Sequence, residues 1–397
     1  MSDEIDILVV GGGVAGLSAA AVFADSGRRV LCIDRAPAGA GARDTRTAAL
    51  FRPAVDLLER AGVWPLLAAE TARLEVMRLI DAGGRENRPR ETGDFDSEEI
   101  GLSSFGWNVP NAALRVALEA RLAALPSAAL RHGAAIEALT ARRDIAIARL
   151  STGESVRAKL VIGADGRESR VRELVEIGAR RWGYGQKALV FTVSQERPHS
   201  NTSIEIHRTG GPFTLVPMPD GPGPDGAVGP RSSVVWMERA AEADRLAALD
   251  DAAFDGALNA RALGVFGALH ATTPRAAWPI ISLLASRLTR PRVALIAEAA
   301  HVAPPIGAQG LNMSLADIAA LLDATAAEDD PGAPAALRRY QRRWPELAVR
   351  VAGIDALNRA AMTGAQPLRD LRRLGLGALI RARPARRAAM RFGLGGR

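Results

Sequence analysis

The sequence of 397 residues has a single cysteine, Cys32, which excludes a disulfide framework and any zinc or iron–sulfur site built from cysteines. Its five histidines are scattered, and no two have the i, i+4 spacing of a helical metal site, so we expect no metal centre. It also contains no His-Glu-x-x-His motif, no Ser-His-Asp order and no evident pair of catalytic carboxylates. If the chain is an enzyme, its reactivity is therefore expected to come from a bound cofactor.

Most of the chain has almost no net charge. The formal net charge is +7, but residues 368–397 carry nine arginines and a single acidic residue, Asp370, so the remainder is nearly neutral. This distribution argues against a nucleic-acid-binding surface spread over the fold. The basic tail has two interpretations of equal weight. It is either a surface that docks on anionic lipid, or a set of solvated helix faces that can also bind a protein partner.

One long uncharged run occurs, at residues 7–24, but it does not predict a membrane-spanning helix. Acidic residues precede the run, whereas a signal peptide begins with basic ones. The consecutive glycines 11–13 would also weaken a helix at that point. We expect no spanning helix and no export signal, and hence a cytoplasmic protein that is soluble or peripheral to the inner face of the membrane.

The same run fits a strand, a turn and a helix. Residues 4–10 predict a buried strand, residues 14–26 a helix, and residues 29–33 a second buried strand that ends at Asp34. The turn carries the pattern Gly11-x-Gly13-x-x-Gly16. Such a unit binds a dinucleotide, since the helix N-terminus presents free N–H groups to the pyrophosphate and the acidic residue accepts hydrogen bonds from the ribose.

The roles of the glycines follow from their spacing. Gly11 permits the tight turn, Gly13 lets the backbone approach a pyrophosphate, and Gly16 allows the helix to pack closely on the strand. The pattern alone is weak evidence, because residues 221–226 match it as well but lie in a proline-rich loop with no helix after it. Only the first site has the strand–turn–helix context, so we expect one dinucleotide.

Two further predicted strands are each followed by an acidic residue. Residues 160–164 predict a strand that leads into Asp165-Gly166, where a bound ligand or a simple turn-forming aspartate are both possible. Residues 292–297 predict another strand, followed by Glu298, a Pro/Gly loop and a helix over 311–327. Glycines in that loop expose backbone N–H groups, which can hold a ring edge or carbonyl of a cofactor without side-chain chemistry.

The remaining segments predict a second unit. Residues 47–61 have a helical pattern, and residues 187–238 predict a mostly antiparallel sheet with a turn-rich connector at 221–230. Residues 335–397 predict arginine-rich helices broken by Gly and Pro. No internal repeat is evident.

The three carboxylate and glycine motifs, in this order, resemble the flavin-dependent aromatic hydroxylases of the p-hydroxybenzoate hydroxylase type. Within that family the chain is most similar to the ubiquinone-biosynthesis hydroxylases. The resemblance covers nearly the whole chain and includes the following motifs: Asp44-x-Arg46-x-x-Ala49-Leu50, Val109-x-Asn111-x-x-Leu114-x-x-x-Leu118, Tyr184-x-Gln186-x-Ala188-Leu189-Val190, Gly211-Pro212-Phe213-x-Leu215-x-Pro217 and the Arg-Gly-Leu tail at 372–376.

The resemblance implies a set of FAD contacts. They are Gly11, Gly13, Ala15 and Gly16 at the pyrophosphate, Asp34 at the adenosine ribose, Arg35 as a further cofactor contact, Arg46 and Asn111 along the cofactor, Asp165 and Gly166 in FAD and nicotinamide nucleotide binding, Glu298 at the ribityl chain, and Pro305, Gly307, Ala308, Gly310, Leu311 and Asn312 along the flavin ring. It also implies a substrate site under the second sheet, near Leu215, Pro217 and Trp236.

One position departs from the family pattern. The family usually has Gly-Asp where this chain has Ala297-Glu298. The glutamate is one methylene longer, and the alanine adds a Cβ at a tight strand end. We expect FAD to bind here all the same, with the hydrogen bond to the ribityl chain aimed differently.

The implied fold is α/β: a Rossmann-like FAD-binding domain, an interleaved mostly antiparallel β-sheet substrate domain and a helical C-terminal tail. The expected ranges are 1–80, 101–183 and 281–334 for the FAD-binding domain, 81–100 for an excursion into the substrate domain, 184–280 for the substrate domain itself, and 335–397 for the basic helical region.

The activity that the resemblance implies is hydroxylation of an aromatic ring, by the following reaction cycle. NAD(P)H reduces FAD, O₂ forms a flavin C4a-hydroperoxide, and its distal oxygen passes to a prenylated phenol on the route to ubiquinone. Two alternatives stay open: hydroxylation of a small soluble phenol, and a non-catalytic subunit that keeps the fold within a quinone-biosynthesis complex. His301 lies near the third motif, but we interpret it as a packed histidine and not as a catalytic base.

Overall fold

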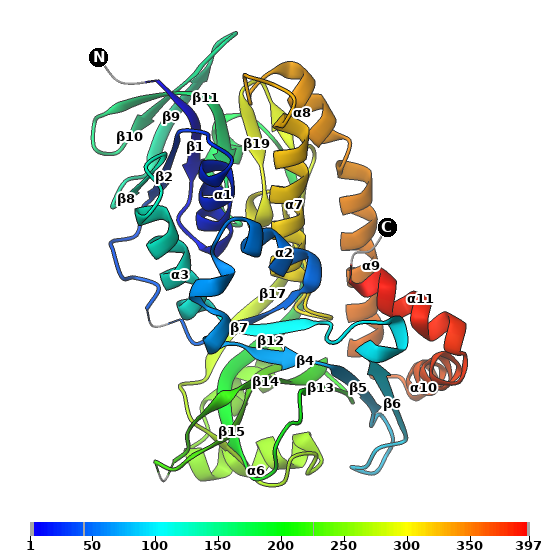
Figure 1. The fold of residues 1–397 in the computed structure, drawn as a ribbon. Helices are drawn as coiled ribbons and strands as arrows, with labels where there is room; N and C mark the ends of the chain where they lie inside the picture. Colours follow the sequence, from blue (N-terminus) through cyan, green and yellow to red (C-terminus); the bar gives the residue numbers. More distant parts are fainter. Residues whose placement is uncertain (1–3, 43, 225, 395–397) are drawn as a thin grey trace.

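The computed structural model describes residues 4–42, 44–224 and 226–394, which form two large sheets arranged one above the other (Figure 1). The upper sheet has eight strands, with the main order β18-β19-β11-β1-β2-β8. Its strands are β1 (Ile5–Val10), β2 (Val30–Asp34), β8 (Ala128–His132), β9 (Ile136–Ala141), β10 (Ala146–Leu150), β11 (Ser155–Gly163), β18 (Thr289–Arg290) and β19 (Val293–Leu295). The five strands from β19 to β8 run parallel, as in a dinucleotide-binding sheet.

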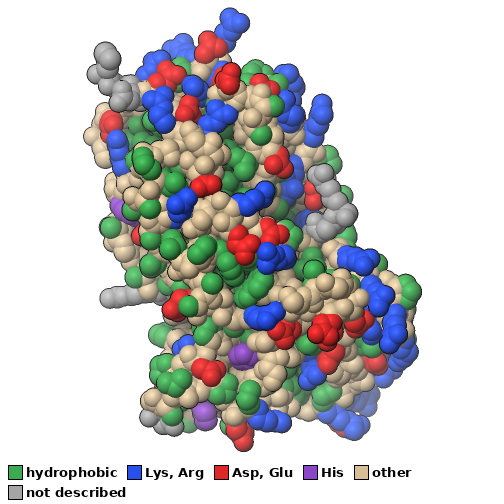
Figure 2. Space-filling view, viewed as in Figure 1, with side chains coloured by type: hydrophobic (Ala, Val, Ile, Leu, Met, Phe, Trp, Pro, Cys, Tyr) green, Lys and Arg blue, Asp and Glu red, His purple; other side chains and the backbone are tan. Residues whose placement is uncertain are grey.

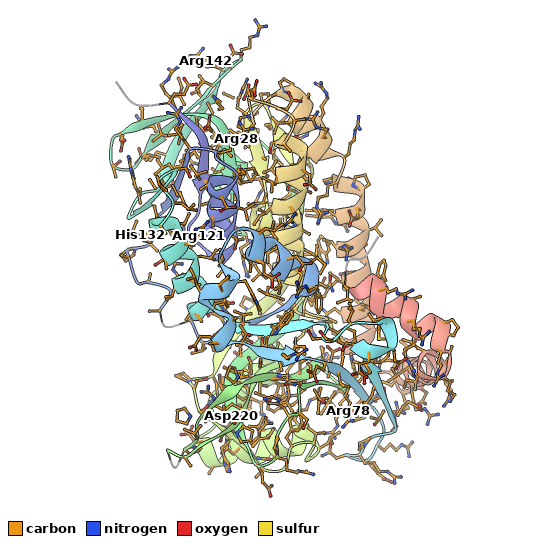
Figure 3. The ribbon with its side chains drawn as sticks, viewed as in Figure 1. Arg28, Arg78, Arg121, His132, Arg142 and Asp220 are labelled. Carbon is orange, nitrogen blue, oxygen red and sulfur yellow. The ribbon has the colours of Figure 1, made fainter. Side chains whose placement is uncertain are left out.

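Helices α1 (Val14–Asp25), α3 (Asn111–Ala123) and α7 (Gln309–Thr325) cover one face of this sheet. The first of them is apolar on nearly every side, because it is buried between the sheet and its neighbouring helices. Arg121 of α3, labelled in Figure 3, joins this layer together: it donates to Asp25 Oδ1 at 2.6 Å and to the carbonyl of Ala61 at 2.8 Å. These two bonds tie α3 to the end of α1 and to Ala61.

The lower sheet has nine strands, with the main order β20-β17-β12-β15-β14-β13-β5-β6 and β16 paired to β12. Every pair is antiparallel except β5 with β13. Its strands are β5 (Val76–Asp81), β6 (Glu91–Asp96), β12 (Ala179–Gln195), β13 (Thr202–His207), β14 (Pro212–Pro222), β15 (Val228–Arg239), β16 (Leu269–Ala271), β17 (Ala276–Ala285) and β20 (His301–Val302). The expected α/β class with a mostly antiparallel second sheet is confirmed.

The two faces of the lower sheet have different neighbours, because successive side chains of a strand alternate in direction. The outer face packs under α5 (Ala240–Ala247) and α6 (Asp251–Ala262). The inner face is turned toward the upper sheet, and its apolar residues Ala188, Val190 and Met237 pack with Ile306 of the loop after β20. We use the terms outer face and inner face in this sense below.

The structure corrects one sequence expectation between the sheets. Residues 47–61 were expected to be helical throughout, but Thr47–Phe51 forms strand β3, and helix α2 begins only at Arg52 and ends at Arg60. Strand β3 pairs with β7 (Gly106–Pro110), which also pairs with β4 (Ala72–Leu74). Pairing with β7 outweighs the helical preference of the alanines and leucine, and Pro53 lies in the first turn of α2, where proline is well accommodated.

The chain enters the lower sheet earlier than expected. Strand β5 begins at Val76, whereas the excursion was expected to begin at residue 81, and the polar stretch that follows contains β6. The proline-rich connector at 221–230 is the tip of the β14–β15 hairpin, where Gly221 pairs with Gly229. It has no helix after it, so the second match to the glycine pattern lies on a hairpin.

The C-terminal region forms helices α8 (Pro334–Gln341), α9 (Trp344–Met362), α10 (Gln366–Arg381) and α11 (Arg383–Gly393). The last two pack beside β5 and β6 (Figure 1), where Met390, Leu376 and Leu379 join an apolar cluster with Phe95. The short elements are α4 (Arg170–Leu174), η1 (Trp64–Leu66), η2 (Ala68–Glu70), η3 (Ser97–Ile100) and η4 (Ala297–Ala299). Among the residues described, no helix combines the length and apolar character that crossing a bilayer requires.

Candidate functional site

The turn between β1 and α1 is shaped by its glycines. Gly11 has φ +108°, and a Cβ at Gly16 would overlap the carbonyl oxygen of Gly11. Gly13 differs, because a Cβ there would meet no atom of the protein within 4 Å. It is the N-cap of α1, and no side chain caps the helix. The free N–H groups and the open space beside Gly13 fit a pyrophosphate, while Gly11 and Gly16 serve packing.

Asp34 lies at the end of β2, where the sequence predicted it. Its Oδ1 accepts a hydrogen bond from the N–H of Ala36 at 3.1 Å, and Arg115 of α3 approaches its Oδ2 at 3.4 Å. Arg115 was missed by the sequence analysis, although its i, i+4 spacing from Asn111 places both on one face of α3. Arg35, the neighbour of Asp34, is exposed.

Asp44, Arg46 and Asn111 form a connected group between the two sheets. Arg46 donates to both carboxylate oxygens of Asp44, at 2.8 and 2.7 Å, and its guanidinium lies 5.1 Å from the ring centroid of Trp278 on β17. Burial raises the pKa of Asp44, but the hydrogen bonds from Arg46 outweigh it and bring the pKa below its usual value. Asn111 donates to Asp44 at 3.3 Å, and its Oδ1 is buried without a partner in the described structure. An unpaired acceptor at this position fits a polar ligand group.

The aspartate of the second motif is held by its own loop. Asp165 accepts hydrogen bonds from Ser169 Oγ, the N-cap of the short helix α4, at 2.5 Å and from the N–H of Val171 in its first turn at 2.9 Å. These bonds give Asp165 a structural role in its own loop, and its contact with FAD or a nicotinamide nucleotide stays a prediction. Gly166 has φ +85° and open space where a Cβ would lie, so its backbone remains free to contact a ligand.

Glu298 follows β19 in an exposed position. Arg167 donates to its two carboxylate oxygens at 3.1 and 3.2 Å, and this arginine was also missed by the sequence analysis. Ala297 has φ +54°, the left-handed conformation that favours glycine. The Cβ of Ala297 therefore makes the backbone at this strand end strained, as expected.

The loop after β20 presents backbone to open space. Gly307 and Ala308 have φ +61° and +56°, and a Cβ at Gly307 or Gly310 would meet no protein atom within 4 Å. Ala308 is the N-cap of α7, which has no side-chain cap. The open N-terminus fits a ring carbonyl or another acceptor. Pro305 is exposed, while Leu311 packs against the core of the upper sheet.

The side chain of Asn312 is hydrogen-bonded within the protein. Its amide donates to the carbonyls of Ala49 and Ala308, each at 2.7 Å, and its Oδ1 accepts from the N–H of Phe51 at 2.8 Å. The side chain is therefore used to fasten the start of α7 to β3. Its place along the flavin ring stays a prediction.

His301 is packed, as the sequence analysis inferred. It is 3% exposed, and its Nε2 lies 2.6 Å from Asp317 Oδ2, while Arg343 donates to Oδ1 of the same aspartate at 3.0 Å. The N–H of Ala297 donates to Asp317 Oδ2 as well, at 3.0 Å. Burial raises the pKa of Asp317, but His301 and Arg343 outweigh it and lower the pKa below the usual value. The network ties α7 and the C-terminal helices to the strand end that carries Glu298.

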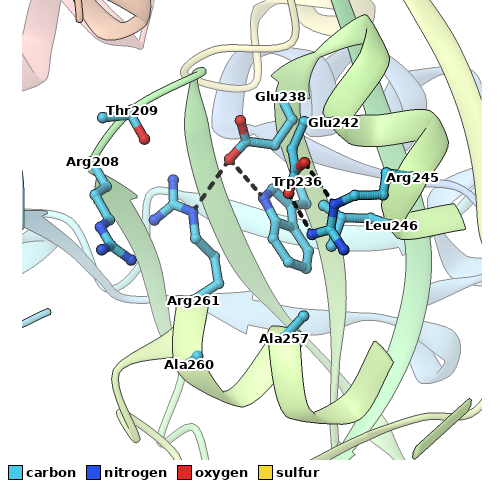
Figure 4. A pocket seen from close by; sticks show the side chains of 10 residues that line it. All are labelled: Arg208, Thr209, Trp236, Glu238, Glu242, Arg245, Leu246, Ala257, Ala260 and Arg261. Atoms are coloured by element: carbon cyan, nitrogen blue, oxygen red, sulfur yellow. Dashed lines mark hydrogen bonds and ion pairs between the residues drawn. The ribbon is translucent and has the colours of Figure 1, made fainter. Parts of the chain in front are cut away.

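The structure differs from the expectation for two of the substrate residues. Leu215 and Trp236 lie on the outer face, where they pack with Phe213 and with Phe254 of α6. Trp236 also borders a hollow of about 390 Å³ on that side (Figure 4), where burial raises the pKa of Glu238. Pro217 accepts a hydrogen bond from Asn108 of β7 at 2.8 Å through its carbonyl.

The side chains that face the cofactor loop are the strand neighbours of those residues. Thr214, Val216 and Val235 point to the inner face and stay partly exposed, whereas Leu215 is wholly buried. A shift of one position along a strand moves a side chain to the other face. The site is therefore bordered by the inner face, by the loop over 303–312 and by the Asp44–Arg46–Asn111 group.

The chain is similar to several known proteins. Residues 4–355 match the family described as FAD binding domain. The chain is 37% identical to the ubiquinone hydroxylase UbiL of Rhodospirillum rubrum, over 98% of this chain and 89% of that protein. It is 31% identical to the 3-demethoxyubiquinol 3-hydroxylase of Escherichia coli, over 98% of each chain.

A solved structure shows the same fold. The p-nitrophenol 4-monooxygenase PnpA from Pseudomonas putida superposes with a TM-score of 0.80 at 18% identity, over 100% of this chain and 99% of that chain. PqsL from Pseudomonas aeruginosa, a probable FAD-dependent monooxygenase, superposes with a TM-score of 0.72 at 22% identity, over 98% and 99%. With the family match over residues 4–355 and the open cradle at Gly13, these findings show that the chain belongs to the FAD binding domain family and is a flavin-dependent monooxygenase.

Proposed function

We propose that this enzyme hydroxylates the aromatic ring of a prenylated phenol on the route to ubiquinone, with NAD(P)H and O₂ as co-substrates. The observation that carries the proposal is the 37% identity to a ubiquinone hydroxylase over 98% of the chain. The 31% identity to a 3-demethoxyubiquinol 3-hydroxylase over the same span supports it. The apolar part of the inner face, where Val216 and Val235 are partly exposed beside Thr214, suits an apolar ring substrate.

The chain's own residues bind and orient the reactants in this proposal. FAD supplies the redox chemistry, and the free N–H groups at Gly13 hold its pyrophosphate while Asp34 accepts from the adenosine ribose. Arg46 and Asn111 lie along the cofactor, and Glu298 reaches toward the ribityl chain. The backbone of the loop over 305–312 lines the flavin ring, and the inner face excludes water from the reacting atoms.

The test is the quinone profile of a strain that lacks this chain, with and without complementation. We expect loss of ubiquinone and accumulation of a prenylated phenol that lacks one hydroxyl, and the missing hydroxyl identifies the ring position. An unchanged profile would contradict a non-redundant biosynthetic role. Small soluble phenols would then be screened for stimulation of NAD(P)H oxidation by the purified flavoprotein.

A non-catalytic role is tested separately, because the Ala297-Glu298 departure leaves it as the alternative. The purified chain is mixed with FAD and then with NADH or NADPH under anaerobic conditions. Bleaching of the flavin absorbance by either nucleotide supports an enzyme. Bound flavin that neither nucleotide reduces, with or without a phenol present, supports a structural subunit.

The Ala297-Glu298 pair also yields a prediction for cofactor affinity. We expect Glu298→Asp to bind FAD as tightly as the parent or more tightly, since a shorter carboxylate restores the family's usual side chain at this strand end. The matched variant Ala297→Gly removes a left-handed Cβ that costs about 1 kcal/mol, and it should not weaken binding either. Flavin fluorescence titration measures both, and loss of flavin by Glu298→Asp would show that the role given to position 298 is wrong.

We propose further that the C-terminal helices contact an anionic membrane surface. Basic side chains gather over α10 and α11, with acidic ones beside them (Figure 2). Leu368, Leu371 and Leu374 of α10 are 54%, 64% and 61% exposed, and two of them border a groove of about 720 Å³ that Arg239, Arg359 and Arg372 also line. Exposed leucines beside arginines suit a lipid surface, where each basic residue contributes about 1 kcal/mol.

Deleting the tail would be a poor test, because Met390 and Leu379 pack on Phe95 and Phe105. Substituting Leu368, Leu371 and Leu374 by Ser leaves that packing in place. We expect the parent to co-sediment with vesicles containing phosphatidylglycerol but not with pure phosphatidylcholine, and the triple variant to lose binding at least fivefold. Equal binding by both proteins would remove the lipid contact, and a protein-partner surface would remain for the tail.

A further inference from the structure

Strand β13 carries polar side chains on the inner face, where Leu79 of β5 and Thr214 of β14 flank Glu205 and Asp81 of β5 lies opposite His207. Ile204 and Ile206 point to the outer face and are wholly buried with α6. The alternate residues Ser203, Glu205 and His207 point to the inner face. On the adjacent β5, Arg78, labelled in Figure 3, lies opposite Ile204 on the outer face and pairs with Asp94. Glu205 is thus a carboxylate on the face turned toward the cofactor loop, and it is only 8% exposed.

The register places Glu205 between two contacts with that loop. On one side it lies opposite Leu79 of β5, which packs in the cluster that contains Ala308. On the other side it lies opposite Thr214, which is followed across the sheet by Val235 and Val190, and these two pack with Ile306. Ile306 and Ala308 belong to the segment that we place along the flavin ring. Glu205 therefore lies in the middle of a row of inner-face residues whose outer members contact that segment.

The hydrogen bonds of Glu205 leave one oxygen available. Its Oε1 lies 2.7 Å from His207 Nε2, which orients the carboxylate along the strand. No other hydrogen bond joins its side chain to the described residues, and Oε2 is not sealed from solvent. A buried carboxylate with a free oxygen is costly unless a donor pairs with it. The partly exposed Thr214 beside it leaves room for that donor.

We infer that Glu205 is the residue that recognises the ring hydroxyl of the phenolic substrate, by accepting a hydrogen bond from that O–H at Oε2. The inference rests on the proposed function and adds a residue that selects a free phenol over its ether. His207 acts as a positioning residue, because it holds Oε1 and leaves Oε2 for the substrate. A site built around a buried acceptor rejects an analogue that cannot donate to it.

The experiment uses the FAD-loaded protein and two probes that differ only at the oxygen: 2-geranylphenol and its methyl ether. Binding is followed by the change in flavin absorbance, which requires no turnover. We expect the parent to bind the phenol at least tenfold more tightly than the ether. Glu205→Leu should lose that preference by weakening binding of the phenol at least tenfold, while FAD affinity and binding of the ether stay within twofold.

Glu238 provides a matched control. It is a similarly buried glutamate on the same sheet, but it faces α6, so Glu238→Leu should keep the preference for the phenol. If Glu205→Leu retains the preference as well, the inference is overturned and the proposed function stands. If the parent binds neither probe, the prenylated-phenol proposal fails and the inference fails with it. Phenol-dependent NAD(P)H oxidation gives a second readout, in which the KM for the phenol should rise and its kcat change less.

Discussion

Gly13→Asp should abolish FAD binding and leave the fold intact. A Cβ at Gly13 meets no protein atom within 4 Å, and the residue has φ −70° and ψ 173°, which aspartate adopts readily. Aspartate is also a favoured N-cap, so the apoprotein should be as stable as the parent or more stable by a few tenths of a kcal/mol. Its carboxylate would occupy the place proposed for the pyrophosphate, and two like charges there would repel. We expect the Kd for FAD to rise at least a hundredfold.

The measurement is flavin fluorescence titration of the apoprotein, together with thermal unfolding of the apo form. Gly16→Ala is the contrasting variant, because its Cβ would overlap the carbonyl oxygen of Gly11 and push α1 away from β1. That variant should lose thermal stability as well as FAD, whereas Gly13→Asp should lose FAD alone. A Gly13→Asp protein that purifies with a full complement of flavin would show that the pyrophosphate lies elsewhere.

The second large effect concerns the buried charge network around Asp317. Asp317→Asn should lower the free energy of unfolding by about 3–5 kcal/mol, the range for removing one partner of a buried ion pair. The aspartate is 0% exposed and is shared by His301, Arg343 and the N–H of Ala297. Without its charge, the Arg343 guanidinium is left in a largely buried position with no equivalent partner. Urea unfolding followed by tryptophan fluorescence at pH 7 measures the change.

The same network predicts a pH dependence with a defined sign. His301 and Arg343 hold the pKa of Asp317 below its unfolded value of 3.8, so its stabilisation is fully present above that value. It is lost as the pH falls through the lower pKa of the folded state. The parent should therefore lose stability in this acid range by a larger amount than Asp317→Asn does. Asp244→Asn, which breaks the exposed pair with Lys187, is the control and should cost less than about 1 kcal/mol. Equal acid sensitivity of the parent and Asp317→Asn would contradict this account.

The elements that local sequence predicts well are those whose pattern is self-contained. Strand β1, helix α1 and strand β2 lie within a residue or two of their predicted bounds, because apolar runs and a glycine turn specify them with little outside help. The start of α7 and the acidic residues at the strand ends are also predicted from local sequence alone. Residues 47–51 are not, since their alanines and leucine form β3 only because β7 lies beside them.

The candidate site residues divide in the same way. Some follow from local sequence, and others are recognised only in the folded structure. Asp34, Asp165 and Glu298 lie at or just after strand ends that local sequence predicts, and their cofactor contacts stay predictions. Arg115 and Arg167 were missed, as they reach their partners from a helix and a loop that only the fold brings near. The sequence places Asn312 along the flavin ring, which stays a prediction, and only the structure shows that its amide fastens α7 to β3.

The sequence by itself determined the dinucleotide turn, the α/β class and the family, because each depends on residues close together in the chain or on motifs in a particular order. Only the tertiary structure decided which face of the lower sheet borders the site. Leu215 and Trp236 are apolar and fit either face, and their side-chain direction depends on strand register and on the helix that covers them. The same register turns Glu205 toward the cofactor loop, since a strand of period two assigns adjacent residues to opposite sides.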